Sequence, residues 1–211
     1  MTEHWRTVQD GDLDTLSRQL GRPVRDVVEI GARCVCGNPL VATTAPRLSK
    51  GIPFPTTFYL THPVITAAVS RLEASGLMSE MSERLRLDDD LAARYRKAHE
   101  HYLAIRDEIG QRSGVGAVPE IAGVSAGGMP ERVKCLHVLV GHSLAAGPGV
   151  NPLGDEALER LAPWWTQDRC YCDGAWDTAG PAPSKDLSRH VRTQEQKGGH
   201  VQRSNNSQEG A

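Results

Sequence analysis

The residues of this chain best suited to chemistry are its five cysteines and eight histidines. Thiolate and imidazole are ligands of zinc, and iron–sulfur clusters usually take four cysteine thiolates. The best-placed candidates lie in three short segments: Cys34 with Cys36, Cys135 with His137 and His142, and Cys170 with Cys172. Their types predict a metal site that holds zinc or an iron–sulfur cluster.

Helical spacing ranks the candidates of the second segment. Residues seven apart lie nearly on one face of a helix, so we expect Cys135 and His142 to point towards the same partner and His137 to face elsewhere. The predicted metal ligands are therefore Cys34, Cys36 and Cys135, completed by His142, His137 or a cysteine of the third segment.

Other cysteines and histidines rank lower. Cys170 and Cys172 adjoin the C-terminal tail, and His62 is a weaker addition at the end of a predicted strand. The alternative is that cysteine behaves as a small hydrophobe, so that a thiol such as Cys135 is simply buried. The Cys34 segment fits this alternative less well, because a polar Gly-Asn turn is usually exposed.

A second candidate site is an anion-binding helix start. Residues 126–130 are glycine-rich and lead into a helix predicted to begin at Pro130. Free amides at a helix N-terminus, with cations nearby, bind phosphate or carboxylate. The predicted anion-binding residues are Gly128, Arg132 and Lys134, and the alternative is that the glycines only turn the chain.

Extended segments precede most of the helices. Residues 24–44 are rich in β-branched residues and predict a hairpin with Cys34 to Asn38 at its turn. Residues 56–60 predict a third strand, because aromatic and β-branched side chains suit a pleated surface. The N-terminal part therefore predicts a small antiparallel sheet.

Apolar residues at helical spacing predict the remaining elements. The expected helices cover residues 12–20, 63–75, 79–87, 89–109, 130–146 and 152–163. Residues beyond 173 are rich in Gly, Pro, Ser and Gln and carry too little apolar surface to fold. The prediction is an α+β, mainly helical single domain over 12–172, with a flexible N-terminus at 1–11 and a disordered tail at 173–211.

Composition bounds the function classes. The formal charge of −2 gives no field that would select nucleic acid or an anionic membrane. No apolar run approaches the roughly 20 residues of a membrane span, and the N-terminus lacks the pattern of a secretion signal. We therefore expect a cytoplasmic protein without nucleic-acid or membrane partners, whose thiols are reduced or metal-bound.

Several motifs together resemble one bacterial family. They are the segments 33–39, 53–56, 72–76, 132–137 and 147–155, which read RCVCGNP, PFPT, LEASG, RVKCLH and GPGVNPLGD. The chain resembles the actinobacterial domain-of-unknown-function 501 family over most of residues 13–172. The resemblance implies a bacterial cytoplasmic protein and no assigned activity, although some members carry a septum-formation label taken from gene neighbourhood.

Three functions fit these observations. The first is a metal-binding protein with zinc or an iron–sulfur cluster. The second is a non-catalytic protein that recruits an unknown protein partner in cell-envelope or polyphosphate physiology. The third is an enzyme that acts on a small anionic substrate at the predicted helix start.

Overall fold

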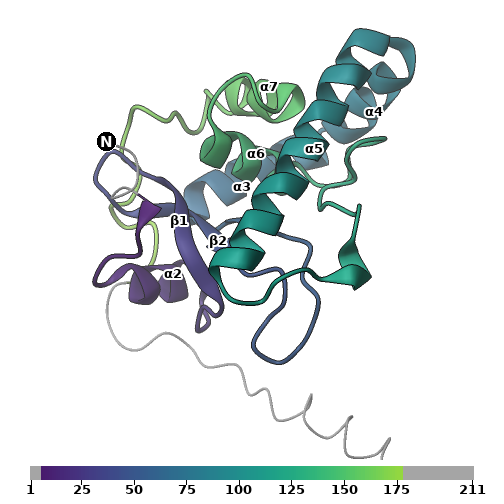
Figure 1. Cartoon of the computed structure of the whole chain (residues 1–211). Helices are drawn as coiled ribbons and strands as arrows, with labels where there is room; N and C mark the ends of the chain where they lie inside the picture. The colour runs from purple at the N-terminus through teal and green to yellow at the C-terminus, as the bar shows by residue number, and fades with distance from the viewer. Residues whose placement is uncertain (1–5, 178–211) are drawn as a thin grey trace, which may run out of the picture.

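In the computed structural model, residues 6–177 are described (Figure 1). The predicted disordered tail therefore lies outside the described residues from position 178 onward, as does the N-terminus up to position 5. In chain order, the elements are α2 (Asp12–Leu20), β1 (Val27–Arg33), β2 (Pro39–Thr44), β3 (Phe58–Leu60), α3 (Pro63–Ala74), α4 (Leu77–Leu87), α5 (Asp89–Arg112), the 3-10 turn η1 (Pro119–Ile121), α6 (Leu136–Ala146) and α7 (Pro152–Arg160).

The three strands form one antiparallel sheet in the order β1-β2-β3. The β1–β2 pair is irregular, with register shifts near Glu29, Ala32 and Arg33. Every residue of β2 is buried, because the strand lies between its two neighbours and helices cover the sheet. The predicted α+β fold, mainly helical with a small N-terminal sheet, is confirmed for the described residues.

Helix α6 is the central helix and packs directly on the sheet (Figure 1). Nine of its eleven residues are buried, from Leu136 to Ala145 with the exception of His137. A Cβ added at Gly141 would lie 2.9 Å from the carbonyl oxygen of Phe58, so only glycine lets α6 approach β3 this closely. The close packing of α6 on the sheet therefore sets the positions of Cys135 before the helix and Gly147 after it.

The helical part of the fold surrounds α6. The N-terminal turns of α3 and α7 carry proline, which suits the first turn of a helix. Asp88 caps α5 by accepting a hydrogen bond from the amide of Leu91 at 2.9 Å. The paired helices α4 and α5 extend to one end of the molecule, away from the hairpin turn (Figure 1). No helix of the described residues is long and apolar enough to cross a membrane.

The predicted helix start at Pro130 is wrong, because α6 begins at Leu136. Gly127 and Gly128 have φ of 78° and 91°, which turn the chain before any helix forms. The amide of Lys134 then donates to the carbonyl oxygen of Gly127 at 2.7 Å, which closes a turn rather than a helical repeat. The glycine segment therefore acts as a turn.

Candidate metal centre

The turn of the β1–β2 hairpin carries the first two cysteines. The amide of Cys34 donates to the carbonyl oxygen of Asn38 at 2.8 Å, and the amide of Gly37 donates to that of Cys34 at 2.8 Å. Gly37 has φ of 94°, a conformation that residues with a side chain rarely adopt. The tight turn buries Cys34 and leaves Cys36 exposed.

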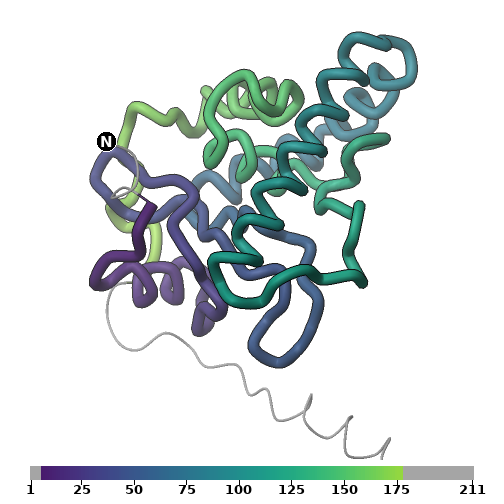
Figure 2. The backbone as a smooth tube through the Cα atoms, in the orientation of Figure 1, coloured from purple at the N-terminus to yellow at the C-terminus, as the bar shows by residue number. Residues whose placement is uncertain are grey.

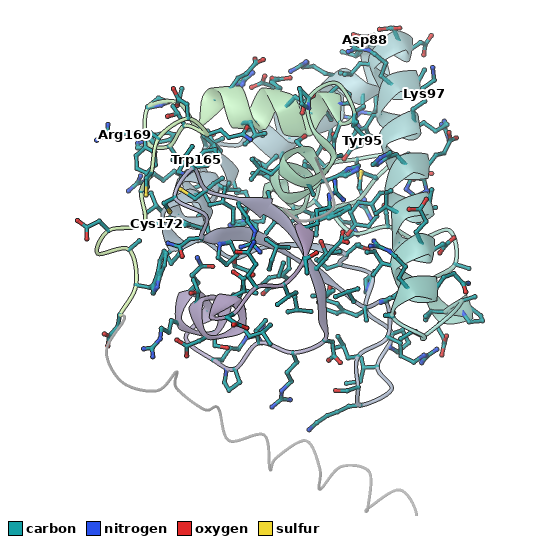
Figure 3. The ribbon with its side chains drawn as sticks, turned by 60° about the vertical axis from the view of Figure 1, so that its left-hand side comes forward. Asp88, Tyr95, Lys97, Trp165, Arg169 and Cys172 are labelled. Carbon is teal, nitrogen blue, oxygen red and sulfur yellow. The ribbon has the colours of Figure 1, made fainter. Side chains whose placement is uncertain are left out.

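The segment after α7 brings the last two cysteines to this turn (Figure 2). Trp165 is only 3% exposed and anchors the segment in the core, and the Tyr171 ring packs against it at 6.5 Å between centroids. Figure 3 shows Trp165, Arg169 and Cys172 on the same side of the molecule, remote from Asp88 at the far end of the helices. The C-terminal segment thereby reaches a hairpin that precedes it by more than a hundred residues.

Four sulfur atoms converge where the two segments meet. We name this set the four-cysteine group: Cys34, Cys36, Cys170 and Cys172. All four Sγ atoms lie within 4.8 Å of one another, and those of Cys36 and Cys172 are 3.4 Å apart. All are free thiols. The group is composed of two C-x-C pairs from distant parts of the chain.

Two polar side chains donate hydrogen bonds to these sulfur atoms. The amide of Val64 donates to Nδ1 of His62 at 3.3 Å, so the ring proton resides on Nε2. Nε2 lies 3.4 Å from Sγ of Cys172, and Nδ2 of Asn38 lies 3.4 Å from Sγ of Cys36. His62 is fully buried and packs edge-on against Trp176. His62, the weaker ligand candidate, therefore lies beside the four-cysteine group with its Nε2–H directed at the sulfur of Cys172.

The pKa values of the neighbouring thiols shift in opposite directions. Burial raises the pKa of Cys34 and of Cys172. For Cys36 burial has the same direction, but hydrogen bonds from the backbone of Asn38 and from Cys172 outweigh it and lower the pKa to about 7. Cys36 therefore loses its proton readily, whereas Cys34 and Cys172 resist deprotonation unless a cation binds their sulfur atoms.

A buried ion pair holds the hairpin end in place. The guanidinium of Arg33 donates to both carboxylate oxygens of Asp12 at 2.8 Å and 2.6 Å, and to the carbonyl oxygen of Gly37 at 2.9 Å. Burial raises the pKa of Asp12, but the hydrogen bonds from Arg33 and the amide of Gln9 outweigh this and lower it below its ordinary value. The N-terminal helix α2 therefore supports the turn that carries Cys34.

The other predicted ligands do not join Cys34 and Cys36. Cys135 and His137 form a separate set with Glu73, whose ligand atoms also lie within 4.8 Å of one another, and we name it the Glu73 group. Nδ1 of His137 is 3.1 Å from the carboxylate of Glu73 and 4.0 Å from Sγ of Cys135. These contacts, with that to Cys135 the largest, raise the pKa of His137 to about 9 although burial opposes the shift. The expectation that His137 faces away from Cys135 is wrong, because Cys135 precedes the helix in an extended conformation.

His142 lies apart from both cysteine-containing groups, in a buried hydrogen-bond network. The carboxamide oxygen of Asn151 accepts from the amide of Gly154 at 3.1 Å, so its nitrogen faces Nδ1 of His142 at 3.2 Å and donates. Nε2 of His142 then donates to Nδ1 of His101 at 3.0 Å. Burial, and secondarily His101, lower the pKa of His142 to about 3. Both ring nitrogens are occupied within the core.

The predicted anion site loses its structural basis. Gly128, Arg132 and Lys134 lie in the turn before α6 and not at a helix start. At the true start of α6, the amide of Leu136 already donates to a carboxylate oxygen of Glu73 at 2.7 Å. The side chain of Glu73 therefore takes the place that an external anion would need.

The members of the four-cysteine group that the sequence places in second rank are Cys170 and Cys172. A signal was available, because both ends of the future site have the same C-x-C spacing. No sequence signal indicates Glu73, because a carboxylate in the last turn of a helix is usually solvated. Only the packing of α3 against α6 places it next to Cys135.

Comparison with known proteins adds a family but no activity. The family model described as protein of unknown function (DUF501) matches residues 30–159, which is more than half of the chain. The matched segment contains Cys34, Cys36 and the whole Glu73 group, whereas Cys170 and Cys172 follow it. No curated protein and no solved structure matches the chain.

Proposed function

The chain belongs to the DUF501 family of proteins of unknown function, and we propose that it is a metal-binding protein whose four-cysteine group holds one tetrahedral ion, zinc in preference to iron. The observation that carries the proposal is the convergence of four Sγ atoms within 4.8 Å. Thiolates bound at about 2.3 Å to one tetrahedral ion lie about 3.8 Å from each other. The 3.4 Å separation of Cys36 and Cys172 and the 4.8 Å upper limit for the group lie on either side of that value, so only small shifts of the sulfur atoms would reach the tetrahedral geometry.

The same spacing argues against an iron–sulfur cluster. Several irons and bridging sulfides inside a cluster hold its cysteine sulfurs farther apart than a single ion does. Here the sulfurs of Cys36 and Cys172, which come from different pairs, are only 3.4 Å apart. A mononuclear tetrathiolate site selects zinc or a single iron.

The role that fits this ion is structural. Four protein ligands close the coordination shell and leave no position for substrate, as in structural zinc sites. The ion would fasten the segment after α7 to the hairpin, and the donors His62 and Asn38 would offset part of the thiolate charge.

Metal analysis of the purified protein tests the proposal. We expect zinc without acid-labile sulfide, and a tetrathiolate charge-transfer spectrum after cobalt replaces zinc. Cys36→Ser should abolish this spectrum, whereas the matched control Cys135→Ser should preserve it. A folded protein without metal, or a tetrathiolate spectrum that survives Cys36→Ser, would contradict the proposal, and acid-labile sulfide would assign a cluster instead.

A further inference from the structure

The Glu73 group lies beside a cleft of about 470 Å³. Cys135 and His137 line the cleft together with residues of β3 and several polar side chains, among them Thr61 and Thr66. All three members of the group are partly exposed. The group is therefore accessible to a small molecule, in contrast to buried polar clusters such as that of His142.

Hydrogen bonding fixes which nitrogen of His137 faces the group. Nε2 lies 3.2 Å from the carbonyl oxygen of Thr66, which accepts only. The hydroxyl of Ser70 donates to the same carbonyl oxygen, so it accepts from Nε2, which is 3.4 Å away. Nε2 must therefore carry a proton, and in the neutral ring Nδ1 presents its lone pair.

That lone pair points at two other acceptors. Nδ1 lies 3.1 Å from a carboxylate oxygen of Glu73 and 4.0 Å from Sγ of Cys135. An imidazole lone pair, a carboxylate and a thiolate repel one another unless a cation lies among them. A proton on Nδ1 satisfies two of these atoms, whereas a metal ion satisfies all three.

We infer that the Glu73 group is a second metal site, which binds one zinc-type divalent ion through the carboxylate of Glu73, the thiolate of Cys135 and Nδ1 of His137. The contact from Nε2 to the backbone carbonyl of Thr66 is the support that metal-bound histidines commonly have on their other nitrogen. The charges of the carboxylate and the thiolate balance that of the ion.

The group offers three protein ligands, and because two of them, Cys135 and His137, line the cleft, a fourth position on a bound ion would be open to a ligand from the cleft. Sites with three protein ligands and one open position are typical of catalytic zinc, where the open position takes water or an oxygen atom of the substrate. The ligand class is thus a small molecule with a carbonyl, carboxylate or phosphoryl oxygen. This inference is independent of the four-cysteine group, because the two sets share no residue.

Zinc stoichiometry and release kinetics test the inference. Native protein should hold two equivalents of zinc, one removed quickly by a chromogenic chelator and one slowly, because the open site is accessible. His137→Ala should retain only the slowly released equivalent. The matched control His99→Ala, which removes another half-exposed imidazole, should retain both.

Glu73→Gln provides a second variant in which folding is preserved. The carboxamide oxygen still accepts the hydrogen bond from the amide of Leu136, while the ligand charge is removed. We expect affinity for the quickly released zinc to fall at least tenfold, with the slowly released zinc unchanged. One equivalent in the native protein that persists in His137→Ala, or two equivalents that are both lost in Cys36→Ser, would overturn the inference.

Discussion

The two ligand groups use similar chemistry but differ in which parts of the chain supply the ligands. The four-cysteine group joins a hairpin turn to a segment that follows α7, so it connects remote parts of the fold. The Glu73 group lies at the packed junction of α3 and α6, which other contacts already hold together. We therefore expect loss of the four-cysteine group to lower the stability of the fold, and loss of the Glu73 group to weaken metal binding without unfolding the protein.

Replacement of one cysteine in each group gives the largest expected contrast. We expect Cys34→Ser to lower the free energy of unfolding by on the order of 5 kcal/mol, because a structural metal is lost. This corresponds to a fall of about 10 °C or more in Tm. Cys135→Ser should cost about 1 kcal/mol or less, since Cys135 is only half-buried. Calorimetry of both variants measures the two losses of stability. Equal losses in Cys34→Ser and Cys135→Ser would contradict the predicted difference between the two groups.

Loss of the buried carboxylate beneath the hairpin should have the next largest effect. Asp12→Ala leaves the guanidinium of Arg33 without its main anionic partner, although its bonds to the backbone of Thr7 and Gly37 remain. Breaking a buried ion pair in this way costs about 3–5 kcal/mol. Denaturant unfolding measures the loss, and chelator release measures the metal. We expect faster release from the four-cysteine group and no change at the Glu73 group; a stability close to that of the native protein would contradict the anchoring role of Asp12.

Acid should weaken the core around α6 through His142. Its pKa is about 3 in the folded protein and 6.5 is its ordinary value, so the unfolded chain binds a proton that the folded chain does not. The free energy of unfolding is therefore highest above pH 6.5 and falls as the pH decreases towards 3, by up to about 1.4 kcal/mol per pH unit from this residue.

The matched variant for this prediction is His142→Gln, which keeps hydrogen-bonding capacity but does not titrate. Between pH 6.5 and 5 its unfolding free energy should fall less steeply than that of the native protein, by up to about 2 kcal/mol over the interval. Because both proteins retain the same thiols, the difference isolates His142. Parallel pH profiles would show that the ring is not held neutral by the core.

Local sequence signals predicted most of the fold. The Asn-Pro start of α7, the Asp88 cap of α5 and the glycine-containing hairpin turn are all formed as their residue types predict. The failure at Pro130 has a local cause too, since two glycines with positive φ turn the chain before a helix begins. Residue type alone does not reveal which conformation such glycines adopt.

The sequence predicts that cysteines form the candidate metal site, but it does not predict which cysteines come together. Thiols at a turn predicted metal chemistry, yet the choice of Cys135 over Cys172 relied on periodicity along one helix. The extended backbone at Cys135 and the return of the segment after α7 are tertiary features that no local pattern encodes. Glu73 enters its group for the same reason, through packing between helices.

The most direct test of the central claim is X-ray absorption at the metal edge of the His137→Ala variant, which leaves the four-cysteine group intact. We predict a single zinc ion surrounded by four sulfur atoms at about 2.3 Å and no second metal nearby. Nitrogen or oxygen in the first coordination shell, a neighbouring iron, or the absence of any bound metal would contradict the account.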